Sequence, residues 1–251
     1  MHRFYLPPPA SLRDRLDLAG REAHHALRVL RLQPGERVLV LDGAGHESIC
    51  LVDQVSRDTL ELKVLEQKFT PAPPCPVTLI VAVPKGKIIE HIIQKAVELG
   101  TQRVAPLLTD RVISQLDDEG AEQKREKWQQ VACEAIKQCG APWLPRIEAP
   151  VTIPEFLARG EMLELALVGA LSSPRRHPRE CFAAFRKSHG RPPRSAGIWI
   201  GPEGDFTREE LQLIECSGAE AVTLGELTLR VETAAIYGLS ILSYELSSTT
   251  C

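Results

Sequence analysis

Short apolar stretches separated by turn residues mark the first 65 residues of the chain. Three of them, residues 37–41, 48–55 and 59–65, predict β-strands. The Asp-Gly-Ala-Gly sequence at 42–45 is typical of the turn in a β-hairpin. One short helix is expected near residues 22–30. Short strands at such close spacing predict a small β-barrel.

Four prolines occur within residues 69–76. Proline lacks a backbone N–H donor and restricts the residue before it, so this stretch cannot form a regular helix or strand. The stretch therefore predicts a boundary, with a first domain over residues 1–70, a linker over 71–76 and a second domain over 77–251.

The pattern changes after this linker. Residues 77–83 form a run that is apolar apart from the hydroxyl of Thr78 and rich in β-branched residues, as expected of a strand that is buried on both faces of a parallel sheet. Further strands are predicted at residues 103–108, 163–168, 198–200 and 221–224. Apolar residues recur at helical spacing over residues 87–99, 119–139, 207–217 and 231–246. This alternation of strands and helices predicts an α/β domain with a mainly parallel sheet.

Composition narrows the class of protein. Of 251 residues, 43% are apolar and 25% charged, which excludes a disordered chain and a collagen-like repeat. The apolar run at 77–83 is far shorter than the ~20 residues that cross a membrane, and the N-terminus lacks the apolar core of an export signal. The seven cysteines are scattered without a Cys-x-x-Cys pair, which favours reduced thiols in a cytoplasmic protein. The histidines show no metal-ligand spacing, so no metal is expected.

Charge is unevenly distributed along the chain. The net charge is −3, which does not indicate a nucleic-acid binder, but residues 174–194 carry seven basic side chains and one acidic one. Residues 200–232 carry eight acidic and two basic side chains. A basic segment either grips phosphate or forms a solvated, arginine-rich helix face, and the charge pattern leaves both interpretations open.

Three glycine-containing segments follow predicted strands, where ligands of open α/β sheets bind. They are 84–87 (Pro-Lys-Gly-Lys), 201–204 (Gly-Pro-Glu-Gly) and 224–234, which begins with Leu-Gly. None has the spacing of a phosphate-binding loop. A tight structural turn, a solvated helix start and an ordinary first-turn acid are the alternative interpretations.

In combination, these segments resemble a known family. Val83-Pro84-Lys85-Gly86, residues 93–100, Gly201-Pro202-Glu203-Gly204 and the segment with Leu229-Arg230 and Glu232-Thr233-Ala234 occur in the order and spacing of the bacterial small-subunit ribosomal RNA uracil-N3 methyltransferases, the RsmE type of the SPOUT superfamily. The resemblance spans nearly the whole chain. It implies an N-terminal PUA-like β-barrel that binds RNA and a C-terminal α/β methyltransferase domain with a trefoil knot.

The resemblance also implies a cofactor and an assembly. Family members bind S-adenosylmethionine (SAM) in the knot loops and pair as homodimers. Carried over by position, the residues expected to bind the cofactor are Leu167, Gly169, Leu171, Ile200, Gly201, Pro202, Glu203, Gly204, Leu224, Gly225, Leu229, Thr233 and Ala234. The implied partner is small-subunit (16S) ribosomal RNA. The residues expected to bind it are Arg3, His25, Arg28, Arg31, Lys85, Lys87, Arg175 and Arg176.

The implied reaction assigns roles to two residues. The N3 atom of uracil is a weakly acidic imide that must lose its proton before it attacks a methyl sulfonium. A cation that stabilises the resulting anion and a group that takes the proton would both promote this step. Arg230 is the candidate for the first role, and Glu232 is the candidate for orienting Arg230 or accepting the proton.

The sequence departs from the family pattern at several positions near the expected site, among them the strand end Gly169-Ala170-Leu171, where the family usually carries an acid. Ala141 and Leu227 stand where the family has arginine, and Asp205 stands where it has glycine. These differences keep two alternatives open: a non-catalytic RNA-binding paralogue, and a SPOUT methyltransferase that acts on a different nucleotide. A nucleotide-binding α/β enzyme without RNA is disfavoured because the phosphate-binding fingerprints are missing.

Overall fold

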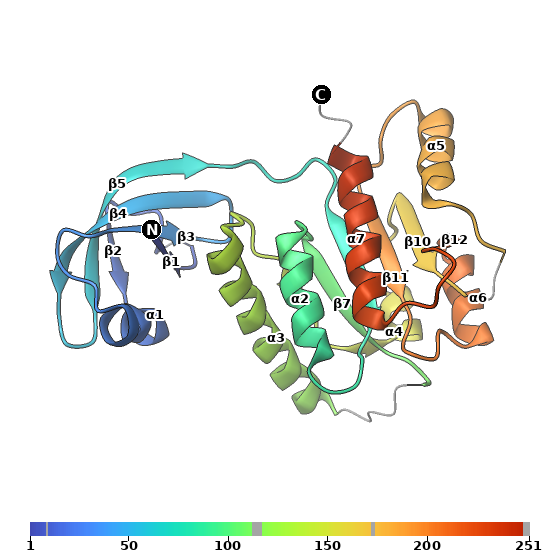
Figure 1. The fold of residues 1–251 in the computed structure, drawn as a ribbon, viewed down its shortest axis with the longest axis horizontal. Helices are drawn as coiled ribbons and strands as arrows, with labels where there is room; N and C mark the ends of the chain where they lie inside the picture. Colours follow the sequence, from blue (N-terminus) through green and yellow to red (C-terminus); the bar gives the residue numbers. More distant parts are fainter. Residues whose placement is uncertain (9, 112–116, 172–173, 248–251) are drawn as a thin grey trace. The chain divides into compact units, whose positions relative to one another are not determined.

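A computed structural model gives the fold (Figure 1) and describes residues 1–8, 10–111, 117–171 and 174–247. The chain forms two compact units. Unit 1 comprises Met1–Ala72 and Cys133–Leu144, and unit 2 comprises Pro73–Ala132 and Pro145–Cys251. In the described parts of the chain, no helix is both long and apolar enough to cross a membrane.

Unit 1 is built on a curled five-stranded sheet in the order β1-β3-β4-β5-β2. Its strands are β1 (His2–Tyr5), β2 (Arg15–Leu18), β3 (Arg37–Leu41), β4 (His46–Val55) and β5 (Leu60–Phe69). The three predicted strands are confirmed as β3, β4 and β5. The register between β4 and β5 shifts at Ile49/Cys50 and at Val52/Gln54, and such bulges bend a sheet.

The predicted short helix is also present, as α1 (Gly20–His24) followed by one π-helical segment, η1 (His25–Leu30). Phe4, Ala23 and Ala26 are fully buried between this segment and the sheet, in one hydrophobic cluster. Arg31 ends the segment in the left-handed conformation, with φ 55°.

Residues 133–144 belong to unit 1, although the sequence predicts one continuous second domain from residue 77. The helix α3 (Asp118–Cys139) ends in this stretch. A guanidinium nitrogen of Arg3 donates hydrogen bonds to the carbonyls of Lys137 (3.2 Å) and Gln138 (2.8 Å). The Lys137 ammonium lies 2.7 Å from a carboxylate oxygen of Glu22. These contacts join residues that are far apart in sequence, so no local sequence pattern predicts them.

Unit 2 contains a seven-stranded sheet in which every pairing is parallel. The order is β12-β10-β11-β6-β7-β8, with β9 beside β7. The bounds are β6 (Val77–Ala82), β7 (Arg103–Leu108), β8 (Arg146–Ile147), β9 (Val151–Thr152), β10 (Leu165–Gly169), β11 (Ala196–Ile200) and β12 (Glu220–Val222). All residues of the two central strands β6 and β11 are buried. The predicted parallel α/β sheet is therefore confirmed, and the carboxyl ends of its strands meet at one edge.

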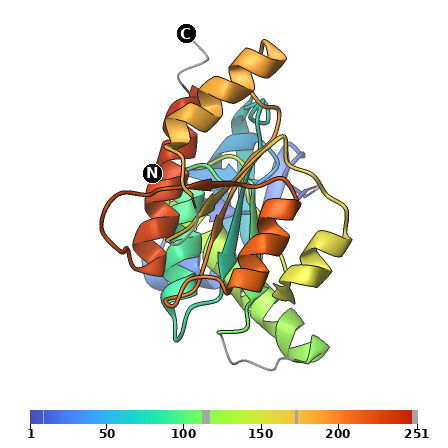
Figure 2. The ribbon, with the colours of Figure 1, turned by 90° about the vertical axis from the view of Figure 1, so that its right-hand side faces the viewer.

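Helices cover both faces of this sheet (Figure 2). They are α2 (Ile88–Glu98), α3, α4 (Ile153–Ala158), α5 (Pro178–His189), α6 (Arg208–Cys216) and α7 (Val231–Ser247). The helices α2 and α7 contact each other on one face, and α4 contacts α6 on the other. A Cβ atom at Gly238 of α7 would come within 2.4 Å of Ile198, so glycine there lets α7 lie close against β11.

The chain is threaded between two segments at β12. The Ala170 N–H donates to Val222, while on the other side the Arg176 N–H donates to Ala221 and the Thr223 N–H donates to Arg176. The strand β12 therefore lies between two parts of the chain, the end of β10 on one side and Arg176, which follows β10 in the sequence, on the other. Such threading is expected of the knot that the family resemblance implies.

Candidate active site

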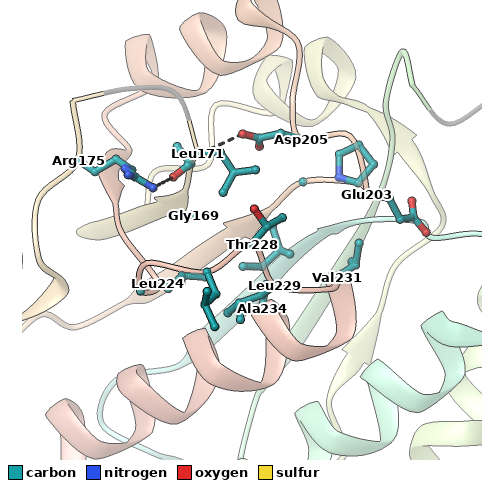
Figure 3. A pocket seen from close by; sticks show the side chains of 16 residues that line it. Gly169, Leu171, Arg175, Glu203, Asp205, Leu224, Thr228, Leu229, Val231 and Ala234 are labelled. Carbon is teal, nitrogen blue, oxygen red and sulfur yellow. Dashed lines mark hydrogen bonds between the residues drawn. The ribbon is translucent and has the colours of Figure 1, made fainter.

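A pocket opens at the carboxyl edge of the sheet in unit 2 (Figure 3). Its empty volume, including space that is open to solvent, is about 560 Å³. Three segments form it, and its lining consists of residues 169–171, 200–203, 205, 224–225, 227–229, 175, 231 and 234. The segments follow β10, β11 and β12, so the parallel sheet itself brings them together.

Most of the residues expected to hold the cofactor line this pocket. The ten that do are Gly169, Leu171, Ile200, Gly201, Pro202, Glu203, Leu224, Gly225, Leu229 and Ala234. Three do not. Leu167 is 1% exposed within β10, and its side chain belongs to the core. Gly204 lies against the side chain of Arg111, and Thr233 is an exposed residue of the first turn of α7.

Sequence reasoning missed six lining residues as cofactor contacts: Ala170, Arg175, Asp205, Leu227, Thr228 and Val231. Ala170 lies between the expected residues Gly169 and Leu171, and Leu227, Thr228 and Val231 lie within the predicted segment 224–234, so their positions along the chain carried a signal. Whether a given residue of an irregular segment faces the pocket depends on the backbone conformation there. Hydrophobic periodicity does not predict that conformation.

The pocket has an apolar side and a polar side. Leu224, Leu229 and Ala234 lie together on one side in Figure 3, and Arg175 and Asp205 lie opposite them. A guanidinium nitrogen of Arg175 donates to the carbonyl of Ala170 over 3.3 Å. A ligand with an apolar body and a charged end would match this division.

Asp205 ties two of the pocket segments together. One of its carboxylate oxygens accepts from the Leu171 N–H (3.0 Å), and the other accepts from the Phe206 N–H (2.8 Å). Its backbone is left-handed, with φ 64°, a conformation that aspartate tolerates because its short side chain bonds locally. A Cβ atom at Gly201 would lie 3.1 Å from the Asp205 carboxylate. Glycine at 201 therefore makes room for this turn of the loop.

The predicted catalytic pair lies at the rim of the pocket. Arg230 stands between the lining residues Leu229 and Val231 and is exposed, and Glu232 is half-buried in the first turn of α7. Neither side chain lines the pocket itself. Neither side chain forms a hydrogen bond or ion pair with another residue that the structure describes, so both side chains are available to a ligand.

Three of the seven basic side chains in residues 174–194, those of Arg176, Arg186 and Arg191, form ion pairs with acids of unit 2. Arg176 is paired with Glu220, and Arg191 lies 2.7 Å from Glu164. Hydrogen bonds from Arg191 and from the Arg194 N–H lower the pKa of Glu164 to about 2. Part of this segment is therefore engaged within the protein, which weakens its interpretation as a free phosphate-binding face.

The other residues expected to contact RNA fall into three places. Arg3 is held by the carbonyls at the end of α3, as described above. Arg28 and Arg31 are exposed at the end of the η1 segment, and the His25 ring packs edge-on against Phe4 at a centroid distance of 6.2 Å. The third place is a second pocket in unit 2, where Lys85 and Lys87 are both exposed.

The buried cysteines are poor nucleophiles. Burial raises the pKa of Cys50 to about 12, that of Cys133 to about 11 and that of Cys181 to about 12. Because the thiolate is the reactive form, these side chains are inert at neutral pH. No covalent role is assigned to them.

The chain matches two family models. One, described as an RNA methyltransferase domain, covers residues 71–243, and the other, described as an RNA methyltransferase PUA domain, covers residues 18–65. Among similar proteins, the ribosomal RNA small subunit methyltransferase E of a Synechocystis strain is 33% identical, over 98% of this chain and 78% of that protein. The protein of the same name from Bacillus subtilis is 31% identical, over 91% of this chain and 89% of that protein.

Solved structures agree with these matches. Ribosomal RNA small subunit methyltransferase E from Neisseria gonorrhoeae, bound to S-adenosylmethionine, superposes with a TM-score of 0.83 at 27% identity, covering 97% of both chains. A putative methyltransferase from Legionella pneumophila with bound SAM gives a TM-score of 0.83 at 28% identity, covering 96% of both chains. The family model over residues 71–243 and the near full-length relatives show that this chain belongs to the RNA methyltransferase family, with the ribosomal RNA small subunit methyltransferases E as its relatives.

Proposed function

We propose that this enzyme transfers the methyl group of SAM to N3 of a uracil in 16S ribosomal RNA. The observation that carries the proposal is the pocket formed by three strand-end segments in a chain whose structural relatives bind SAM. The relatives' names supply the class of RNA, and the resemblance in sequence supplies the base and the atom.

The lining residues fit SAM. The apolar side, with Leu224 and Leu229, suits the flat adenine ring, and the carboxylates of Glu203 and Asp205 suit its positive sulfonium and ammonium groups. Arg175 offers a cation for its carboxylate. When bound, SAM supplies a methyl group on a positively charged sulfur.

Arg230 and Glu232 serve the RNA base in this proposal. The uracil anion carries charge on the carbonyl oxygens beside N3, and a guanidinium next to them lowers the energy of that charge. Arg230 is exposed at the rim of the pocket, and its side chain lacks a partner among the described residues, which supports this role. Glu232, two residues further along, orients Arg230 or accepts the N3 proton.

The test incubates the protein with labelled SAM and with small ribosomal subunits that lack the modification, and maps the product by mass spectrometry. We expect one methyl group on N3 of a uracil. A methyl group on a ribose oxygen or on another base would contradict the proposal.

The Arg230→Ala substitution tests the catalytic assignment. Loss of one anion-stabilising donor should lower turnover by roughly 10²-fold or more, with the affinity for SAM nearly unchanged. Arg146→Ala is the control, because this arginine is exposed on β8, at the amino end of the sheet. Equal turnover in the two variants would remove Arg230 from the reaction.

A second candidate function is RNA binding without methyl transfer. Asp205 and Leu227, two of the positions that depart from the family pattern, both line the pocket. A paralogue of this kind would bind RNA and leave the subunits unmodified in the same assay.

The remaining parts of the proposal concern partners and place. We infer that Arg28 and Arg31 of unit 1 contact the phosphates of the ribosomal RNA, that the substrate is the assembled small subunit, and that the protein acts as a homodimer in the cytoplasm. The exposed arginines support the first point, and the family resemblance supports the others.

A further inference from the structure

A second pocket, the basic groove, opens where β6 and β7 end. Its empty volume is about 1120 Å³. Five cationic side chains and one carboxylate line it: Lys85, Lys87, Arg111, Lys124, Lys127 and Glu90. They come from the turn after β6, the end of β7 and the helices α2 and α3, so the fold gathers them from separate parts of unit 2.

Most of this positive charge is not neutralised. Lys127 is 2.7 Å from Glu90, but Lys85, Lys87 and Lys124 form no ion pair with any carboxylate in the described part of the chain. Lys124 and Lys127 are three residues apart on α3 and therefore share one face of that helix. The groove thus presents a concentrated positive surface on a protein whose net charge is −3.

The start of α2 adds to this surface. Lys87 is the N-cap residue of this eleven-residue helix and makes no side-chain capping bond. The first N–H groups of a helix have no partner within it and carry partial positive charge, which favours an anion nearby. Trp128 lines the groove but is only 4% exposed, so it offers no ring face on which a base could stack. The groove is therefore suited to phosphate rather than to bases.

The basic groove adjoins the cofactor pocket. The strands β6 and β11 are neighbours, and the two pockets lie at the same edge of the sheet. Arg111 connects them, because its guanidinium donates to the carbonyl of Asp205 over 3.3 Å. A chain of phosphates in the groove would thus pass beside the site of methyl transfer.

We propose that the basic groove binds the phosphodiester backbone of the RNA substrate next to the base that is methylated. This inference rests on the proposed function. It assigns substrate binding to unit 2 as well as to unit 1 and adds Arg111, Lys124 and Lys127 to the two lysines that the sequence suggested. The cations come from three separate parts of unit 2, the turn after β6, the segment after β7 and the helix α3, which matches successive phosphates of a polymer better than a single phosphate group.

The experiment compares two double variants in binding to a 16S ribosomal RNA transcript over a range of salt concentrations. Lys85→Gln/Lys124→Gln removes two charges from the groove. The control, Lys95→Gln/Arg146→Gln, removes two charges at the far end of α2 and the amino end of the sheet. The groove variant should bind RNA about tenfold more weakly and lose about 1.4 from the slope of log K against log salt, about 0.7 for each lost phosphate contact.

Two further measurements make the outcome decisive. Unchanged SAM affinity and melting temperature show that the groove variant is folded, and uridine monophosphate tests whether a single phosphorylated nucleotide is the occupant. Equal RNA affinity and slope in the two double variants overturn the inference, as does a groove-dependent affinity for the mononucleotide alone. Groove-dependent RNA binding without methyl transfer by the unmodified protein would retain the groove and reject the proposed function.

Discussion

At the scale of single residues, Asp205 shows how a departure from the family pattern is accommodated. The position has φ 64°, where glycine is the least strained residue. Aspartate is tolerated because its carboxylate accepts the N–H groups of Leu171 and Phe206. The same two hydrogen bonds hold the segments after β10 and β11 together at the pocket.

This balance predicts different effects for two substitutions at Asp205. Asp205→Ala loses both hydrogen bonds and keeps the unfavourable φ, and should lower the free energy of unfolding by about 2 kcal/mol. Asp205→Gly loses the same bonds but relieves the strain, so it should retain about 1 kcal/mol more stability than the alanine variant. Urea unfolding of both variants measures the difference. Equal stabilities would mean that the left-handed backbone carries no strain.

At the scale of secondary structure, a buried carboxylate joins β7 to α4. Glu148, just after β8, is 5% exposed and accepts hydrogen bonds from Arg103 of β7 (2.8 Å) and Arg159 at the end of α4 (2.7 Å). Both guanidinium groups also lie over the Phe156 ring, at 5.5 and 5.6 Å from its centre. Without Glu148, two like charges would face each other beside this ring.

The pKa of Glu148 predicts how this cluster responds to acid. Burial alone would raise that pKa, but the hydrogen bonds and charges of Arg103 and Arg159 outweigh burial and lower it. The unfolded chain therefore binds a proton more readily than the folded one. The stabilisation by Glu148 is present above the unfolded pKa of about 4.3 and is lost as the pH falls through the lower folded value.

Glu148→Gln should lower the free energy of unfolding by about 3 kcal/mol at pH 7, because it leaves two arginines beside a neutral group. The stability of this variant should also fall less steeply than that of the parent below pH 4.5. Glu161→Gln is the matched control, since Glu161 also pairs with Arg103 but its side chain is 49% exposed, and it should cost less than about 1 kcal/mol. Urea unfolding across pH tests both, and equal losses would show that burial of the pair is irrelevant.

The elements also show what the sequence can predict. The helix α6 was predictable because Thr207 and Glu210 form a capping box at its start, and the structure has both of its hydrogen bonds. In contrast, β8 and β9 have two residues each and β1 and β2 have four, too few for a periodic pattern to emerge. These strands exist because of their partners in the sheet. The helix α4 has six residues and was missed for the same reason.

The candidate site was predictable in its segments but not in its side chains. Strand ends with glycine identified two of the three segments that form the pocket, residues 201–204 and 224–234, because a parallel sheet brings its carboxyl ends together. The segment after β10 was expected only from the family resemblance, and the third glycine segment, residues 84–87, lines the basic groove instead. Whether the side chains of Leu167 and Thr233 point into the pocket depends on the exact strand and helix geometry at each position. Because irregular segments adjoin both residues, the sequence pattern does not show that geometry. The engagement of Arg3 and Arg176 within the protein depends on partners more than 40 residues away in sequence.

At the scale of the whole molecule, α7 extends from the border of the pocket to an exposed helix face. Its buried residues Val231, Ala235, Leu239 and Leu242 pack inside unit 2, and its first turn borders the pocket. Tyr237 and Tyr244, seven residues apart on the same helix face, are 48% and 70% exposed. A second copy of the chain that covered this face would lie close to the pocket and to Arg230.

The proposed homodimer gives the last prediction. Light scattering at micromolar concentration should give twice the mass of the 27.7 kDa chain. Tyr237→Glu places a charge on the exposed face of α7 and should shift the mass to that of the single chain, because a buried, unpaired charge costs several kcal/mol. Leu213→Glu is the control, since Leu213 is 45% exposed on α6 and should leave the dimer intact. A single-chain mass for the unmodified protein would contradict the dimer, and an intact dimer with Tyr237→Glu would place its interface elsewhere.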